Sequence, residues 1–167
     1  MIFLTVGLEK FPFDRLLRAV DRGVEDGTIR GSVFGQIGHS RYVPQHYGHC
    51  RFLPFDQMRT RLESADAVVC HGGVGTILLA LELGKIPLVV PRRAAYGEQV
   101  DDHQLDLVSR LEAAGRILVA GTEEALPEML ARHGELKERG RARPAASPEF
   151  DALVGFLHST LQVGHGS

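Results

Sequence analysis

Residues 66–104 read DAVVCHGGVGTILLALELGKIPLVVPRRAAYGEQVDDHQ, and this stretch decides the fold. An apolar run at residues 67–70 is followed by the glycine-rich turn HGGVGT, and a helical pattern covers residues 76–83. A second apolar run at residues 87–90 leads into a polar loop. This order of strand, glycine turn, helix and strand is typical of α/β proteins that bind phosphorylated ligands. Glycines let the backbone approach the ligand, and the start of a helix offers free N–H groups.

The rest of the chain continues the alternation of strands and helices. Apolar runs predict strands at residues 1–6, 32–37, 50–54, 67–70, 88–90 and 117–119. Helical patterns start near residue 14 and end at Gly27, and recur at residues 57–64, 76–83 and 100–114. Asp56 and Thr122 are expected to be N-cap residues. The pattern predicts an α/β fold, with a Rossmann-like parallel sheet and helices on both faces.

The length of 167 residues suits one domain. A basic stretch at residues 136–148 contains two prolines and no periodicity, and is expected to be a loop. Its charges form either a solvated face or a contact with lipid or a partner. An amphipathic pattern at residues 150–161 predicts a terminal helix.

The composition excludes several classes of protein. The net charge of −2 gives no electrostatic reason to expect nucleic-acid binding. No apolar run approaches the ~20 residues of a membrane span, and the N-terminus lacks the basic region of a signal peptide. Two cysteines form neither a disulfide framework nor a zinc-binding pattern, which fits a reducing, cytoplasmic setting. The histidines are scattered, so no metal site is expected.

The candidate binding residues follow the strands of the predicted sheet. Ligands of parallel sheets bind beyond the carboxyl ends of the strands, which places Gly7, Gly38, the turn at 71–76 and the loop at 92–104 at one edge. The turn matches neither GxGxxG nor the phosphate loop GxxxxGK[ST]. Its glycines and the hydroxyl at the helix start favour a diphosphate, and a tight turn without a ligand is the alternative. The candidate residues in the turn are His71, Gly72, Gly73, Val74, Gly75 and Thr76.

The polar loop adds side chains that suit a sugar or a phosphate. Arg92 and Arg93 are candidate donors to phosphate or to a sugar carboxylate. Acceptors for sugar hydroxyls are available from Asp101, Asp102 and Gln104, and Glu98 and His103 lie in the same segment. A solvated loop that starts a helix is the alternative. His71 is a weak candidate for catalysis or phosphate contact, or it bonds only to backbone, and Gly7 either offers backbone N–H groups or forms a plain turn.

Several segments together resemble a known family. They are FLTVG and FPFDRLLRAV near the start, GQIG at residues 35–38, ADAVVCHGGVGTILLALELGK, and IPLVVPRRAAYGEQVDDHQLDLVSRLEAAG. They resemble the C-terminal, donor-binding half of MurG-type GT-B glycosyltransferases, the glycosyltransferase family 28 C-terminal domain. Within this group the chain looks most like small split subunits. These are the catalytic subunit of the dolichol-pathway N-acetylglucosaminyltransferase and the PssE-type exopolysaccharide glycosyltransferases. The resemblance covers about residues 1–120.

The resemblance implies a site for a nucleotide-sugar donor. It places the diphosphate at residues 72–76, and the sugar and ribose near Arg92 and residues 98–104. The acidic residue that MurG-type enzymes use on the ribose falls here at Leu79, so ribose recognition is expected to differ. A GT-B enzyme needs two such domains. The resemblance therefore implies a membrane-anchored partner subunit that binds the acceptor.

The sequence thus favours the donor-binding, catalytic subunit of a two-subunit inverting glycosyltransferase at the cytoplasmic face of the membrane. It would transfer sugar from a UDP-sugar to a lipid-linked saccharide in exopolysaccharide or capsule biosynthesis, without a metal cofactor. Pairing of Arg92 or Arg93 with a sugar carboxylate would favour UDP-glucuronic acid, and the catalytic base is expected on the partner. One alternative is a non-catalytic accessory subunit. A nucleotide-sugar epimerase is less favoured, because it needs both halves in one chain.

Overall fold

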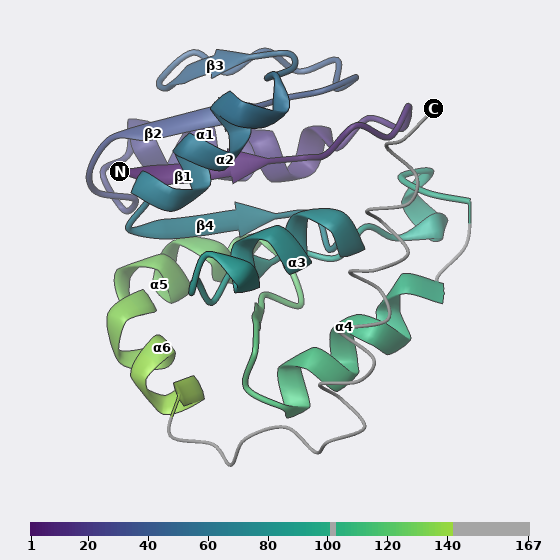
Figure 1. The fold of residues 1–167 in the computed structure, drawn as a ribbon. Helices are drawn as coiled ribbons and strands as arrows, with labels where there is room; N and C mark the ends of the chain where they lie inside the picture. The colour runs from purple at the N-terminus through teal and green to yellow at the C-terminus, as the bar shows by residue number, and fades with distance from the viewer. Residues whose placement is uncertain (101–102, 142–167) are drawn as a thin grey trace.

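The structure, a computed structural model, describes residues 1–100 and 103–141. In this part of the chain six parallel strands form one sheet in the order β3-β2-β1-β4-β5-β6 (Figure 1). Their bounds are β1 (Ile2–Thr5), β2 (Val33–Gln36), β3 (Gly48–Cys50), β4 (Ala67–Cys70), β5 (Leu88–Val89) and β6 (Leu118–Val119). In the register, Ile2 of β1 is aligned with Val33 of β2 and Ala67 of β4. The predicted parallel α/β sheet is confirmed.

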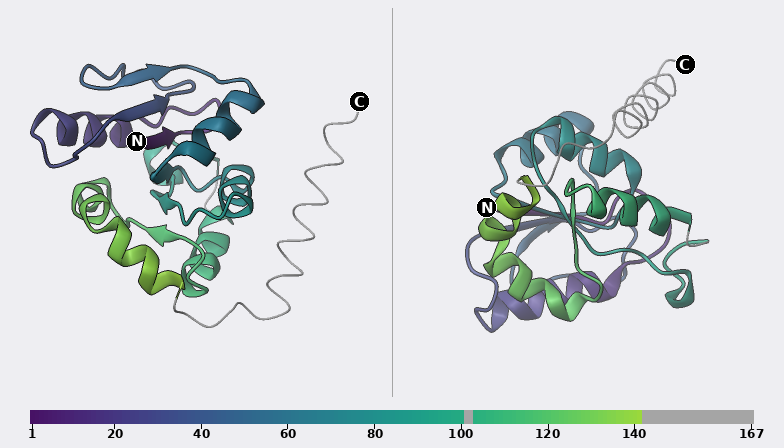
Figure 2. Two further views of the ribbon diagram at one scale, coloured as in Figure 1. Left: turned by 60° about the vertical axis from the view of Figure 1, so that its left-hand side comes forward. Right: turned by 90° about the horizontal axis from the view of Figure 1, so that it is seen from below.

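Helices cover both faces of the sheet (Figure 2). Their bounds are α1 (Asp14–Glu25), α2 (Phe55–Ser64), α3 (Val74–Glu82), α4 (His103–Ala113), α5 (Leu126–Ala131) and α6 (His133–Arg141), with short 3₁₀ helices η1 (Ala94–Tyr96) and η2 (Glu123–Ala125). Successive strand residues point to opposite faces. Leu4 and Val69 pack in the cluster that includes α1 and α5, whereas Phe3 and Val68 pack with α2 and α3. Strands buried on both faces explain the continuous apolar runs.

Some predicted boundaries were wrong. The third strand is at Gly48–Cys50 instead of residues 50–54, and α3 begins two residues before Thr76. Asp56 lies in the first turn of α2, whose N-cap residue is Pro54. Thr122 is the N-cap residue of a helix, as predicted, but that helix is the 3₁₀ helix η2 and the Thr122 side chain makes no cap bond.

Residues 136–141 of the expected basic loop are part of α6 instead, because that helix continues to Arg141. The predicted helix at residues 150–161 lies outside the described residues. No helix in the described part of the chain is both long enough and apolar enough to cross a membrane.

A buried polar chain fixes the carboxyl ends of three strands relative to one another. The Thr5 hydroxyl accepts hydrogen bonds from the Gly7 N–H and from Gln36 Nε2, each at 3.2 Å. Gln36 Oε1 in turn accepts from the Leu53 N–H at 3.0 Å. Thr5 and Gln36 are fully buried, so these bonds replace water that neither side chain can reach. The connections that follow β1, β2 and β3 are therefore held in fixed relative positions.

Candidate functional site

The turn between β4 and α3 leaves an open helix start at the carboxyl edge of the sheet. Gly72 has φ +89°, a conformation that favours glycine. Gly73 is the N-cap residue of α3 and supplies no side-chain cap, and the first turn of α3 contains no acidic residue. The first N–H groups of a helix have no partner within it and carry the positive end of the helix dipole. The start of α3 is therefore suited to an anion.

The space around the turn differs sharply between its glycines. A Cβ on Gly75, in the first turn of α3, would have no atom within 4 Å beyond its own stretch of helix. A Cβ on Gly73 would lie 2.2 Å from Nε2 of His71. A Cβ on Gly7, in the turn after β1, would lie 2.4 Å from Cε1 of the same ring. Gly75 thus borders open space, whereas Gly7 and Gly73 pack against the imidazole.

His71 fills the gap between the turn after β1 and the turn before α3. Its side chain is only 5% exposed, and its Nδ1 has no hydrogen-bond partner among the described residues. Burial, together with the charge of Arg92, lowers the pKa of His71 to about 4. The ring is therefore neutral at physiological pH, and one nitrogen can donate while the other accepts. A neutral ring can offer a hydrogen bond to a phosphate but no positive charge.

Arg92 holds the main chain of three segments together. It is 2% exposed, and its Nη1 donates to the carbonyl oxygens of Phe11, Pro12 and Glu98 at 2.9–3.2 Å. Its Nη2 donates to the carbonyl oxygen of Val6 at 2.8 Å. Burial lowers the pKa of Arg92 to about 10, so the guanidinium remains charged at neutral pH. Because four carbonyls occupy its terminal nitrogens, Arg92 positions the backbone in this structure.

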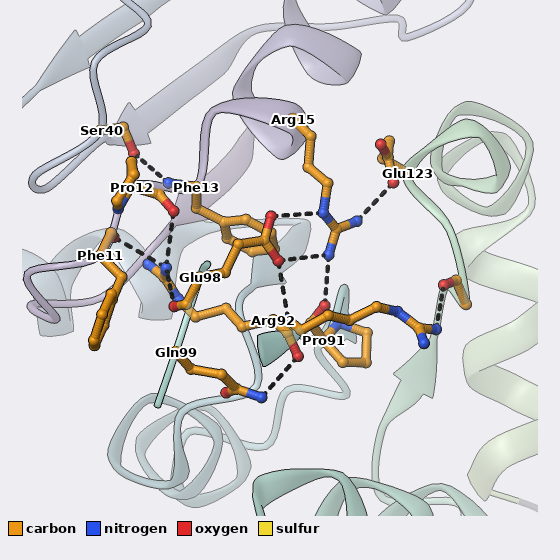
Figure 3. Close-up of polar contacts among 12 residues, drawn as sticks. Phe11, Pro12, Phe13, Arg15, Ser40, Pro91, Arg92, Glu98, Gln99 and Glu123 are labelled. Atoms are coloured by element: carbon orange, nitrogen blue, oxygen red, sulfur yellow. Dashed lines mark hydrogen bonds and ion pairs between the residues drawn. The ribbon is translucent and has the colours of Figure 1, made fainter. Parts of the chain in front are cut away.

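A second arginine, Arg15 in the first turn of α1, pairs with Glu98. Its Nε and Nη2 bind the two carboxylate oxygens of Glu98 at 2.7 and 3.0 Å. Nη2 also donates to the carbonyl oxygen of Pro91, and Nη1 binds Glu123 of η2 at 2.6 Å. The ring of Phe13 contacts both guanidinium groups, with the carbons of Arg15 and Arg92 at 4.9 and 4.7 Å from its centroid. These charges connect the segments that follow β1, β5 and β6 (Figure 3).

The structure brings much of the predicted site together. Gly7 and the turn 71–76 meet at His71, and Gly72 lies beside Pro91, with Pro91 Cα 3.9 Å from a Cβ placed on Gly72. Arg93 is exposed, and its Nη2 donates to the carbonyl oxygen of Gly121. The first two residues of α4 are His103 and Gln104, whereas Asp101 and Asp102 lie outside the described residues.

Other predicted residues have partners within the fold. The Gly7 N–H donates to Thr5, and Glu98, which is 5% exposed, pairs with Arg15. Sequence reasoning missed Arg15 and Glu123 as parts of this region. Both could have been identified from the parallel topology, because helices α1 and η2 begin at the same sheet edge as the polar loop.

The fold and its open helix start fit a known class of domain. A family model described as "Glycosyltransferase family 28 C-terminal domain" matches residues 1–151, and the chain belongs to this family. The UDP-N-acetylglucosamine transferase subunit ALG13 of Homo sapiens is 27% identical over 172 residues, covering 98% of this chain and 14% of that protein.

A second relative comes from a bacterium. The UDP-N-acetylglucosamine--N-acetylmuramyl-(pentapeptide) pyrophosphoryl-undecaprenol N-acetylglucosamine transferase of Bdellovibrio bacteriovorus is 30% identical over 129 residues, covering 68% of this chain and 34% of that protein. The chain thus spans 14% and 34% of the length of these two relatives.

Solved structures share the fold. MurG of Acinetobacter baumannii superposes with a TM-score of 0.58 at 17% identity, over 94% of this chain and 49% of that one. The calicheamicin glycosyltransferase CalG4 gives a TM-score of 0.58 at 17% identity, over 84% of this chain and 37% of that one. In both cases this chain corresponds to less than half of the other protein.

Proposed function

We propose that the chain is the donor-binding, catalytic subunit of a two-subunit inverting glycosyltransferase that uses a UDP-sugar. The observation that carries this proposal is the uncapped start of α3 beside the open space at Gly75, in a domain of glycosyltransferase family 28. Two relatives are named for UDP-N-acetylglucosamine, which supports a uridine nucleotide as the donor. The proposed donor-binding residues remain those predicted from the sequence. Two of them would act indirectly, because Arg92 binds backbone carbonyl oxygens and Glu98 binds Arg15.

The proposed reaction is a single displacement. The acceptor hydroxyl oxygen bonds to the anomeric carbon as the bond from that carbon to the diphosphate oxygen breaks, and a base takes the hydroxyl proton. Backbone N–H groups at the start of α3 would stabilise the negative charge that develops on UDP, in place of a metal ion. His71 can add a neutral hydrogen bond. The base would come from the partner subunit that binds the acceptor.

A partner is proposed because the site is open at the sheet edge. Five of the six exposed large hydrophobic side chains of the described residues lie in the segments that follow strands β1, β3 and β5, at Leu8, Phe52, Phe55, Tyr96 and Val100, and the sixth, Val43, lies in the loop between β2 and β3. An apolar rim around a polar site is typical of a surface that another protein covers. We propose that a membrane-anchored, acceptor-binding subunit covers it at the cytoplasmic face. The acceptor would be a lipid-linked saccharide of exopolysaccharide or capsule assembly.

Two donor sugars are compatible with this proposal, N-acetylglucosamine and glucuronic acid. The names of the relatives point to N-acetylglucosamine, whereas a free arginine near the sugar would favour glucuronic acid. Arg92 is held by carbonyls, so an exposed Arg93 is the candidate partner for a sugar carboxylate. Calorimetry with UDP-glucuronic acid and UDP-N-acetylglucosamine distinguishes the two donors. If Arg93 pairs with a sugar carboxylate, Arg93→Ala should lower the affinity for UDP-glucuronic acid and leave the affinity for UDP-N-acetylglucosamine unchanged.

UDP itself tests the donor site. The chain should bind UDP in isothermal titration calorimetry, and Gly75→Ala should weaken binding about tenfold because its methyl group enters the open space beside the helix start. Alanine in a helix is favoured over glycine by up to about 1 kcal/mol, so the variant should be no less stable. Gly134→Ala in α6, where a Cβ also has open space, is the control and should leave UDP affinity unchanged. Absence of UDP binding by the wild-type chain, alone and with its partner, would refute the donor site.

A non-catalytic accessory subunit is the second candidate, and Leu79 is the observation that favours it. This residue stands where related enzymes have an acidic group, and it packs in the apolar cluster with α2 and α3. The nearby Glu82 pairs with Arg59 on the surface at 3.2 Å, so it does not replace the missing acid. The same UDP titration separates the two candidates, since an accessory subunit of this kind binds no donor.

A further inference from the structure

Residues 91–98, which follow β5, are fixed in position by contacts among themselves and with Arg15. Within the loop, the N–H groups of Tyr96 and Glu98 donate to the carbonyl oxygen of Arg93, and the Glu98 carboxylate accepts from the Arg93 N–H at 3.0 Å. Arg15 binds the loop at both ends, through the Pro91 carbonyl oxygen at 2.7 Å and through both carboxylate oxygens of Glu98. A side chain from α1 thus connects the two ends of the loop from residue 91 to residue 98.

The location of this contact connects it to the candidate site. Pro91 and Val108 of α4 both lie beside Gly72 of the turn before α3. The loop and α4 therefore form a second wall next to the open helix start. A shift of the loop would move this wall relative to the α3 N–H groups, and catalysis and binding are sensitive to shifts of that kind.

The Arg15 contact is geometrically demanding. Arg15 and Glu98 side chains are 17% and 6% exposed, so their pairing is shielded from water and salt. Two parallel N–H···O bonds and a stacked phenyl ring of Phe13 fix the plane of the guanidinium. A lysine at this position would keep one positive charge but could not make the fork or the planar stacking. Arg15 therefore determines the position of the loop through geometry as well as charge.

We propose that Arg15 is a positioning residue for donor binding, which it supports by holding the loop 91–98 against α1 through Glu98. This inference rests on the proposed function, since it assigns Arg15 a role at the same donor site. Arg15 does not need to touch the donor. Its effect passes through Glu98 and the Pro91 carbonyl, which it binds at the two ends of residues 91–98.

The test compares two conservative substitutions on the same helix. Arg15→Lys should raise the dissociation constant for UDP about tenfold in calorimetry on the full chain. Arg18→Lys, one turn further along α1, is the control because the Arg18 guanidinium lies 4.2 Å from the centroid of the Tyr42 ring, in the loop between β2 and β3. It should change the UDP dissociation constant by less than twofold. Both titrations are run well below the melting temperature of each variant, so a loss of stability alone leaves UDP affinity unchanged.

A double-mutant cycle shows whether the effect passes through Glu98. Glu98→Gln keeps the shape of the side chain and removes its charge. If Arg15 acts through Glu98, the double variant should bind UDP about as weakly as either single variant. Additive losses would overturn the inference, because they would mean that the two residues act separately. Wild-type UDP affinity in Arg15→Lys would also overturn it while leaving the donor site intact, whereas no UDP binding by the wild-type chain would refute the proposed function and the inference together.

Discussion

His71 shows how a single side chain can determine the residues around it. Its ring lies against two different turns, and a Cβ on Gly7 or Gly73 would enter it. The two glycines differ in one useful respect. Gly7 has φ +77°, which disfavours other residues whatever the space, whereas Gly73 has an ordinary φ of −66°. At Gly73 the requirement for glycine is therefore one of packing alone.

This difference makes Gly73→Ala a direct test of the packing. The substitution should lower the free energy of unfolding by about 1 to 3 kcal/mol, the usual cost of overpacking. Urea unfolding followed by circular dichroism measures the change. In a His71→Ala background the collision partner is gone, so the same substitution should cost less than 1 kcal/mol. An equal cost in both backgrounds would show that the ring is not the cause.

At the scale of residues, sequence reasoning found the glycines but not their different roles. HGGVGT identifies a turn that starts a helix, and the structure confirms that. It does not show that Gly75 borders open space while Gly73 packs against His71, because that depends on the turn after β1, more than 60 residues away in sequence (Gly7 to His71). Arg92 is a similar case. Arginine in a polar loop suggests a ligand, and only the fold shows that four carbonyl oxygens surround it.

At the scale of elements, α1 fixes the loop between β2 and β3. The carboxylate of Asp21, 2% exposed, accepts hydrogen bonds from the Tyr42 hydroxyl at 2.5 Å and from the N–H groups of Gln45 and His46. Burial alone would raise the pKa of Asp21, but these bonds lower it below its ordinary value. A buried carboxylate with several donors stabilises the loop strongly.

Asp21→Asn should therefore lower the free energy of unfolding by about 2 kcal/mol or more, since it removes the buried negative charge that the Tyr42 hydroxyl and the N–H groups of Gln45 and His46 stabilise by hydrogen bonds. The matched control is Asp14→Asn on the same helix. Asp14 holds the same loop through one oxygen, which accepts from the N–H groups of Arg41 and Tyr42, and an asparagine oxygen can keep both bonds. Its loss should be below 1 kcal/mol in urea unfolding. Equal losses would contradict the special role of Asp21.

The elements themselves were largely predictable, and their errors share a cause. Most of the strands are short and buried on both faces, so apolar runs identify them well. The third strand was misplaced because Gly48–Cys50 lies at the edge of the sheet and is only half buried, so it lacks the apolar signal. The start of α6 was missed because its residues are mostly exposed and show no apolar periodicity, although His133 at its start is buried.

At the scale of the whole molecule, the sheet has a polar site and an apolar rim on the same edge. Both follow from the parallel topology, which brings all strand-to-helix connections together. Leu8 and Val100 are 69% and 80% exposed, and they lie with Phe52, Phe55 and Tyr96 in the connections at this edge, so the exposed apolar side chains form a group. The chain also corresponds to less than half of the solved glycosyltransferases MurG and CalG4. Under the proposed function, a partner subunit is expected to cover this edge.

That expectation can be tested by co-purification. The chain is co-expressed with a membrane-anchored, Rossmann-like protein encoded by a neighbouring reading frame. The combined variant Leu8→Ser and Val100→Ser should reduce co-purification at least tenfold, because burying both side chains contributes about 3 kcal/mol or more of apolar transfer energy. Neither residue packs in a core cluster, so the variant should unfold at the same urea concentration as the wild type.

The control is Val43→Ser, which removes an apolar side chain that is also exposed, at 41%, but lies in the loop between β2 and β3 that α1 holds in place. If the carboxyl edge of the sheet is the interface, Val43→Ser should leave co-purification unchanged. Equal loss from both variants would mean that assembly responds to apolar surface in general. Retention of the partner by the Leu8 and Val100 variant would place the interface elsewhere and leave the rim without this role.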